Sequence, residues 1–154
     1  MISELAGAGT KAIVLDANIL IRAVLGRRAF ALLEDYAQRV SFLTPEIAFS
    51  DVAARLPNIL TRRGSQPDDL ETLLGHDILG RLRLLVIAVA SDAYAAREHE
   101  ARRRLARRDE LDWPYLALAL TVDCPIWTED QDFFGSGVAT WTTDRVEFYL
   151  SADG

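Results

Sequence analysis

The sequence is poor in cysteine and in long apolar runs, and each shortage excludes a class of protein. Cys124 is the only cysteine, so no internal disulfide can form, and we expect the reducing environment of the cytoplasm. The longest apolar run, residues 84–90, is far shorter than the ~20 residues of a membrane-spanning helix. Residues 1–10 lack the charged and apolar regions of a secretory signal peptide. We therefore expect neither export nor a membrane segment.

Positive charge is also in short supply. The formal net charge is -6 at pH 7, which argues against binding of nucleic acid through the overall potential of the protein. Any nucleic-acid site has to be local. Half of the residues (50%) are hydrophobic and 26% are charged, which is enough for a sizeable core and gives no sign of disorder. From the length of 154 residues we expect one domain, spanning residues 1–154.

Short apolar runs alternate with helical patterns along the chain. The apolar runs predict strands at residues 12–15, 40–43, 82–89, 125–128 and 138–141. Apolar residues at helical spacing predict helices at residues 18–25, 28–39, 45–56, 68–79, 91–108, 143–150 and from residue 112 onward. Thr44 is expected to cap the third helix, and Pro57 to kink or end it. This order predicts an α/β protein, a three-layer α/β/α fold with a central, mostly parallel sheet.

Four aspartates stand where ligands bind in such a fold, at the carboxyl ends of the strands. Asp16 directly follows the first predicted strand, and Asp130 lies two residues after the fourth. Asp51 lies inside the helix that follows the second strand, and Asp112 opens the helix that leads to the fourth. We expect all four carboxylates to converge on the same edge of the sheet.

Each of these acids also has a purely structural interpretation. Asp16 and Asp112 could cap the helices that they precede, because aspartate is among the best capping residues. Asp130 could simply shape a turn. Asp51 stands in a mainly apolar helix, where a buried carboxylate needs a partner. Position in the sequence leaves both interpretations open for each acid.

Carboxylates that converge repel one another unless a cation neutralises them. Mg²⁺ and Mn²⁺ prefer oxygen ligands and keep positions open for water and phosphate, so one or two such ions would suit this edge. A metal lowers the pKa of its bound water, so no histidine or serine nucleophile is needed. His76 and His99 lie in separate polar segments, Cys124 has no histidine near it in sequence, and no Gly-rich phosphate loop is present.

These residues stand in four blocks whose order resembles that of a PIN domain, the fold of the VapC-type toxin ribonucleases. The blocks are residues 13–20, 43–51, 108–119 and 125–133. The resemblance covers nearly the whole chain. It implies a ribonuclease that hydrolyses phosphodiester bonds with Mg²⁺ or Mn²⁺. It further implies an RNA substrate, a homodimer and, for VapC-like members, an antitoxin that blocks the site.

Carried over by position, the resemblance assigns the metal-binding acids of the family to Asp16, Asp51, Asp112 and Asp130. Asn18 and Thr128 fall on the supporting polar positions, and Asp132 matches the further acid often found beside the fourth. The second acid is usually a glutamate, and the shorter Asp51 stands there in this chain. Glu46 is a fallback ligand at that corner, and Asp109 and Glu110 could contribute through water.

The predicted helix at residues 91–108 is rich in arginine. Arg104, Arg107 and Arg108 lead toward Asp112 and could contact RNA phosphates. They could equally belong to a solvated helix face, in which Glu98 and Glu100 pair with arginines four residues later.

Two alternative functions compete with this one. The chain could be a non-catalytic PIN-fold interaction module in which Asp51 has left poor metal affinity. It could also be an aspartate-based phosphatase or phosphoacceptor domain. The latter is disfavoured because such sites need a lysine, and Lys11 lies at the wrong end of the first strand.

Overall fold

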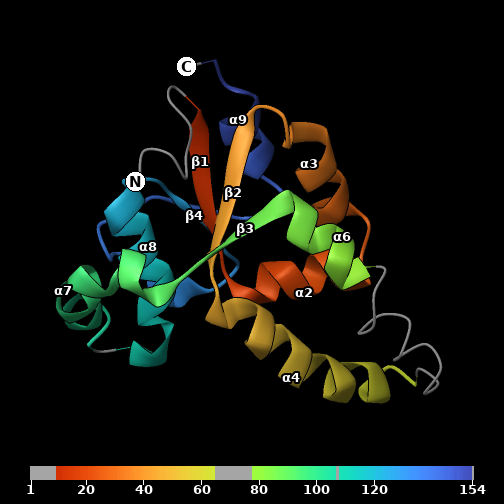
Figure 1. The fold of residues 1–154 in the computed structure, drawn as a ribbon, viewed down its shortest axis with the longest axis horizontal. Coiled ribbons are helices and arrows are strands. Elements are labelled where there is room, and N and C mark those ends of the chain that lie inside the picture. The colour runs from red at the N-terminus through yellow and green to blue at the C-terminus, as the bar shows by residue number, and fades with distance from the viewer. Residues whose placement is uncertain (1–9, 65–77, 107, 154) are drawn as a thin grey trace.

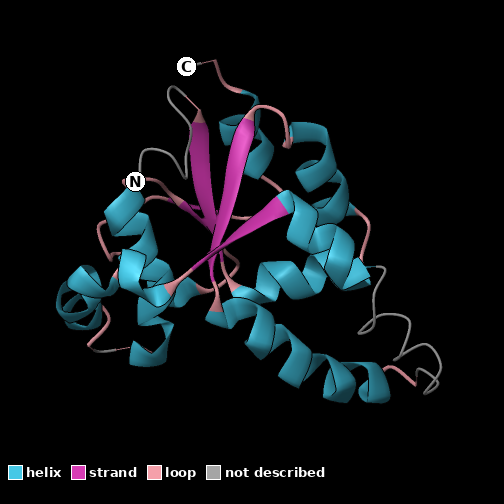
Figure 2. Ribbon diagram, in the orientation of Figure 1, coloured by secondary structure: helices cyan, strands magenta, loops and turns pink. Residues whose placement is uncertain are grey.

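The computed structural model describes residues 10–64, 78–106 and 108–153, and its centre is a parallel five-stranded sheet (Figures 1 and 2). The strands are β1 (Lys11–Leu15), β2 (Val40–Pro45), β3 (Val86–Val89), β4 (Ile126–Trp127) and β5 (Thr140–Trp141). They lie in the order β3-β2-β1-β4-β5, and every neighbouring pair is parallel. The predicted α/β/α fold with a mostly parallel sheet is confirmed.

Helices cover both faces of this sheet (Figure 1). On one side α8 (Trp113–Val122) packs against β1 and β2, and α7 (Glu98–Arg104) packs on α8. On the other side lie α2 (Ala17–Leu25), α3 (Arg28–Tyr36), α6 (Ile78–Leu85) and α9 (Val146–Ser151). Burial on both faces explains why the central strands read as continuous apolar runs: Ile13, Val14 and Leu15 are all fully buried.

The second strand is longer than predicted, because it includes Thr44 and Pro45. The sequence predicts Thr44 as the cap of the next helix, and that prediction is wrong. Its hydroxyl donates instead to the carbonyl of Leu15 on the neighbouring strand, at 2.8 Å. A β-branched residue fits a buried strand, and this contact satisfies its hydroxyl there. The following helix, α4, is therefore Ile47–Arg62, with Glu46 at its N-cap.

The sequence predicts that Pro57 kinks or ends this helix; α4 continues through it to Arg62, so an end of the helix at Pro57 is excluded. The carbonyl that a proline leaves unpaired is that of the residue four positions earlier, here Ala53. Ala53 is exposed, so water can solvate the unpaired carbonyl. The uninterrupted helix extends well beyond the sheet (Figure 1).

Two other boundaries differ because tertiary packing outweighs the local pattern. Residues 82–85, predicted as strand, belong to α6, in which Leu82 is buried and Leu84 is exposed. The single helix predicted at residues 91–108 is broken into two short 3₁₀ turns, Ser91–Ala93 and Ala95–Arg97, followed by α7.

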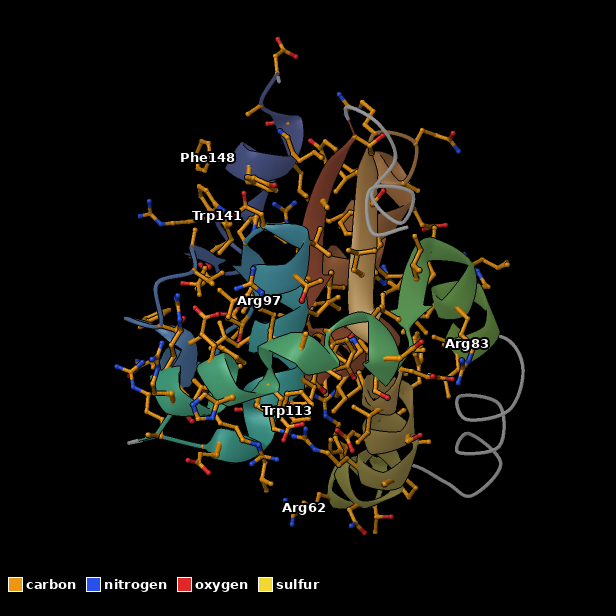
Figure 3. The ribbon with its side chains drawn as sticks, turned by 60° about the vertical axis from the view of Figure 1, so that its left-hand side comes forward. Arg62, Arg83, Arg97, Trp113, Trp141 and Phe148 are labelled. Carbon is orange, nitrogen blue, oxygen red and sulfur yellow. The ribbon has the colours of Figure 1, made fainter. Side chains whose placement is uncertain are left out.

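The break in that helix lies at Tyr94, which is buried and packs edge-on against Trp113 at the start of α8. Figure 3 labels Trp113 beside α7. Helix α3 ends at Tyr36 and not at residue 39, and most of the helix predicted at residues 68–79 lies outside the described residues. Within the described part of the chain, no helix is both long and apolar enough to cross a membrane.

Candidate active site

The structure brings the four predicted aspartates to one small cavity at the carboxyl ends of β1 and β4. The cavity has a volume of about 120 Å³. Asp16, Asp51, Asp112 and Asp130 all line it, and these residues come from four separate segments of the chain. The remaining lining residues are Ala17, Asn18, Arg55, Leu111 and Tyr115.

Asp16 is the most buried of these acids, with 5% of its surface exposed. One carboxylate oxygen accepts a hydrogen bond from the backbone N–H of Ile19 at 2.9 Å, so this residue does cap α2. The other oxygen accepts a hydrogen bond from the hydroxyl of Thr128. Burial raises the pKa of Asp16 to about 6, and the nearby Asp130 adds to the shift, while the hydrogen bonds oppose it. The Asp16 side chain therefore caps α2 and also lines the cavity.

Thr128 links Asp16 to the loop after β4. Its hydroxyl oxygen accepts a hydrogen bond from the backbone N–H of Asp130 at 2.9 Å. Asp130 in turn accepts from the backbone N–H of Asp132 at 2.9 Å, which starts the 3₁₀ turn Gln131–Phe133. The turn-forming role considered for Asp130 is thus present, and the same turn brings Asp132 toward Asp112. One potential ligand atom from each of Asp112, Asp130 and Asp132 lies within 4.8 Å of the other two.

Asp112 precedes α8 but makes no side-chain capping bond. Its carboxylate is half-buried and faces other acids. Burial is the largest cause that raises the pKa of Asp112 to about 7, and repulsion by Asp109, Asp130, Asp16 and Asp132 adds to it. The capping interpretation therefore does not apply to this residue. Its carboxylate makes no hydrogen bond or salt bridge with any described residue, so no structural role explains its position.

Asp51 lies on α4, half-buried, and reaches the cavity as its place in the helix predicted. One turn later, Arg55 donates from Nη2 to Oδ1 of Asn18 at 2.8 Å, across the mouth of the cavity. The fallback ligand Glu46 is not among the lining residues. It lies near Tyr94, whose pKa is raised first by burial and then by the charge of Glu46. The geometry favours Asp51 over Glu46 at this corner.

Sequence reasoning missed Tyr115, three residues after Asp112 on α8. Only 4% of its surface is exposed, yet its hydroxyl has no hydrogen-bond partner among the described residues. Burial raises its pKa, and the charges of Asp51, Asp16 and Asp112 raise it further. An unpaired buried hydroxyl is costly, so a ligand oxygen in the cavity is the natural partner. The i, i+3 spacing from Asp112 was the available signal.

Arg104, at the end of α7, and Arg108, shortly after it, contact the loop that carries the acids. Arg104 donates from Nη1 to the carbonyl of Ser136 at 2.6 Å, and Arg108 from Nη1 to the carbonyl of Asp132 at 2.8 Å. The alternative ion pairs also form, Arg102 with Glu98 at 2.8 Å and Arg104 with Glu100 at 2.7 Å. Arg107 lies outside the described residues. The geometry therefore favours a positioning role for Arg104 and Arg108, and an RNA contact by them stays a prediction.

The donor set of the cavity fits a hard divalent cation. Every potential ligand there is an oxygen, and the pKa values of Asp16 and Asp112 are raised first by burial and then by the charges of neighbouring acids, which a bound cation would offset. The unpartnered hydroxyl of Tyr115 adds a donor that could hold a water or an oxygen ligand.

A parallel α/β/α fold with an aspartate cavity at the carboxyl edge of its sheet defines a class of protein. A sequence profile of this class, described as the PIN domain, matches residues 14–151. The chain therefore belongs to the PIN-domain family, which supports a nuclease activity, and the resemblance found in the sequence is confirmed. Comparison of the sequence with curated proteins finds no match.

Three solved structures illustrate the likeness of fold. One is a chain of VapBC2 from Rickettsia felis, in a complex with a DNA fragment from the VapBC2 promoter. It has a TM-score of 0.64 and 14% identity, and the match covers 85% of this chain and 98% of that one. A chain of FitAB bound to the IR36 DNA fragment has a TM-score of 0.56 and 19% identity, and the match covers 85% of this chain and 94% of that one. A chain of FitAcB from Neisseria gonorrhoeae has a TM-score of 0.52 and 21% identity, and the match covers 85% of this chain and 97% of that one. At these identities the likeness concerns the fold alone.

Proposed function

We propose that this protein is a metal-dependent endoribonuclease that hydrolyses phosphodiester bonds of RNA. The observation that carries the proposal is the convergence of Asp16, Asp51, Asp112 and Asp130 on one cavity. In our proposal these four acids, together with Asp132, hold one or two Mg²⁺ or Mn²⁺ ions. The buried and unpartnered hydroxyl of Tyr115 in the same cavity supports a site built to receive an additional oxygen.

A bound divalent cation supplies a water of lowered pKa and stabilises charge on the phosphoryl oxygens. The protein residues hold the site in place. Asp16 is fixed from two sides, by the N–H of Ile19 and the hydroxyl of Thr128, so its orientation is set before any ligand binds. Thr128 fixes Asp130 through the same hydroxyl. Such preorganisation avoids rearrangement during the reaction.

Arg55 and Asn18 form the polar edge of this cavity. The guanidinium of Arg55 is exposed and makes no ion pair with a described residue, so its charge is available to a phosphate. Asn18 holds Arg55 over the mouth of the cavity through the 2.8 Å hydrogen bond. The family resemblance implies a supporting polar residue at Asn18. We propose that Asn18 supports the site by holding Arg55 in place.

We further propose that the protein is the toxin of a toxin–antitoxin pair in the cytoplasm and acts as a homodimer. The proposal rests on the resemblance to VapC-type toxins and is supported by the fold shared with a VapBC2 chain. An antitoxin that inserts an arginine into the acidic cavity would neutralise the same charges that a metal does. Co-purification with the product of a neighbouring small reading frame, followed by loss of cleavage, tests this pairing.

The primary test is RNA cleavage by the full chain with Mn²⁺ or Mg²⁺ and with EDTA. We expect internal cleavage of a structured RNA with metal and none with EDTA. Asp16→Asn, purified in the same way, controls for contaminating ribonuclease and is expected to be inactive. Equal cleavage by the parent and the Asp16→Asn variant would contradict the assignment. A parent that binds RNA or a partner but never cleaves would favour the non-catalytic interaction module.

A further inference from the structure

A second cavity, of about 480 Å³, lies between α2, α3 and the far end of α4. Four arginines line it: Arg22, Arg27, Arg28 and Arg63. No acidic residue is among the described residues that line it. This concentration of one charge stands out in a chain whose net charge is -6.

Most of this positive charge is uncompensated. Arg28 pairs with Glu147 at 3.2 Å. Arg22, Arg27 and Arg63 form no salt bridge with any residue in the described parts of the chain, and all three are exposed. Exposed guanidinium groups converging from α2, the α2–α3 junction and the end of α4 form a surface suited to phosphate, which they can bind in a bidentate manner.

The second cavity is connected to the acidic cavity by two rows of side chains. On α4 and at its C-cap, Asp51, Arg55, Ile59 and Arg63 follow one another at intervals of four residues, so each lies next to the one before it. The row turns about 120° around the helix between Asp51 and Arg63. The first two line the acidic cavity and the last two line the arginine-rich cavity.

Helix α2 repeats this arrangement. Asn18 lines the acidic cavity, and Arg22, four residues later, lines the arginine-rich one. Helices α2 and α4 pack against each other, as Figure 1 also shows, and the hydrogen bond between Arg55 and Asn18 joins the two rows. From Asp51 to Arg63 the row spans twelve residues, or about 18 Å along the helix at 1.5 Å per residue. That is long enough for several nucleotides of a single strand, at roughly 3.4 Å or more per phosphate.

We propose that Arg55, Arg22, Arg27 and Arg63 form a track that binds the backbone phosphates of single-stranded RNA on one side of the cleaved bond. The inference rests on the proposed nuclease function and deepens it. The track starts at the mouth of the acidic cavity and runs between α2 and α4 to the arginine-rich cavity. In this proposal the RNA contacts lie on the positively charged surface between α2 and α4. The arginines of α7 do not take part.

A binding measurement without catalysis tests the track. A fluorescently labelled RNA of about ten nucleotides, too short for stable structure, is titrated with the full chain in EDTA, and its anisotropy is followed at several salt concentrations. We expect Arg22→Ala/Arg63→Ala to weaken binding about tenfold or more at low salt. The slope of log affinity against log salt should become shallower by about 0.7 for each phosphate that the variant no longer neutralises. Both side chains are exposed, so the melting temperature should stay unchanged.

Arg103→Ala is the matched control, because Arg103 is an exposed arginine on α7 that forms no salt bridge with described residues. It should leave affinity near that of the parent. Arg62→Ala is a second control on α4 itself, since Arg62 projects into solvent at the end of the helix (Figure 3) and does not line the arginine-rich cavity.

Cleavage assays with metal separate the two hypotheses. The track predicts that Arg22→Ala/Arg63→Ala raises KM and leaves kcat close to the parent value. If the parent cleaves RNA and the double variant keeps the parent KM and affinity, the track is wrong and the nuclease assignment stands. Equal loss of affinity in Arg103→Ala would likewise overturn the track. Failure of the parent to cleave any RNA would instead overturn the proposed function.

Discussion

The guanidinium of Arg108 donates a hydrogen bond to the main-chain carbonyl of Asp132 at 2.8 Å. An arginine that sequence alone offered as an RNA contact thus holds the loop that carries an acid of the candidate metal site. Arg104 does the same one turn earlier, through the carbonyl of Ser136. Gly137 leaves the room for this contact, because a Cβ at its position would clash with the Arg104 guanidinium.

This relationship predicts a defect in metal binding for variants of these two arginines. Arg104→Ala loses its hydrogen bond to Ser136 and its ion pair with Glu100, at a cost of about 1 kcal/mol of stability. We expect weaker Mn²⁺ affinity in Arg104→Ala and Arg108→Ala, measured by calorimetric titration, with unchanged RNA affinity in EDTA. A variant with normal Mn²⁺ affinity and reduced RNA affinity would instead place these arginines on the RNA.

Replacement of Asp16 separates its two roles. The amide oxygen of an asparagine at this position would still accept the hydrogen bond from the N–H of Ile19, so Asp16→Asn should keep the cap and abolish cleavage. Without metal its melting temperature should equal or slightly exceed that of the parent at pH 8, because a buried charge is removed. Asp16→Ala should lose about 1 kcal/mol relative to Asp16→Asn. A strongly destabilised Asp16→Asn variant would show that the charge serves the fold.

The metal-free protein should lose stability as pH rises from about 4 to about 7. The pKa of Asp16 is raised from the usual 3.8 to about 6 and that of Asp112 to about 7. The folded state therefore holds these protons more tightly than the unfolded state, and the resulting stability is complete below pH 4 and disappears as pH passes these values. Thermal unfolding in EDTA should show a smaller fall for Asp112→Asn, and saturating Mn²⁺ should reduce the fall in the parent. Identical pH profiles for parent and variant would contradict the prediction.

Tyr115→Phe should affect function without weakening the fold. Its hydroxyl is buried and has no partner among the described residues, so its removal should leave the melting temperature without metal unchanged or slightly higher. The rise in melting temperature on adding Mn²⁺, and the cleavage rate, should both decrease. Tyr149→Phe is the matched control, because the hydroxyl of Tyr149 donates to the carbonyl of Ala12 at 2.8 Å. It should lose stability and keep the response to Mn²⁺. The reverse pattern would show that the Tyr115 hydroxyl has no role in the site.

We expect Asp51 to be a metal ligand whose side chain is one methylene shorter than the glutamate usual at this position, and otherwise well placed. Asp51→Glu is expected to keep or raise Mn²⁺ affinity and cleavage, whereas Asp51→Ala should lower both, as titrations with Mn²⁺ would show. Glu46→Ala should behave like the parent, since Glu46 does not line the cavity. If Asp51→Ala cleaves normally and Glu46→Ala does not, the ligand position moves to Glu46.

The sequence by itself determined the central strands β1 and β2 over most of their length and placed Asp16 and Asp130 just after strand ends. Residues 12–15 and 40–43 are continuous apolar runs, and such runs occur where both faces of a strand are buried. Once the sheet is parallel, acids directly after its strands must meet at one edge, so Asp16 and Asp130 could be placed together without coordinates.

Only the tertiary structure decided which side chains share the site and which leave it. Thr44 remained in its strand because the carbonyl of Leu15 satisfied its hydroxyl, a contact between residues 29 positions apart. Tyr115 and Arg55 joined the cavity, and Arg104 and Arg108 turned to loop carbonyls, through packing between segments far apart in sequence. Local patterns report burial and helical periodicity. Which charged group faces which depends on how α4, α7 and α8 pack around the sheet, and no local pattern contains that information.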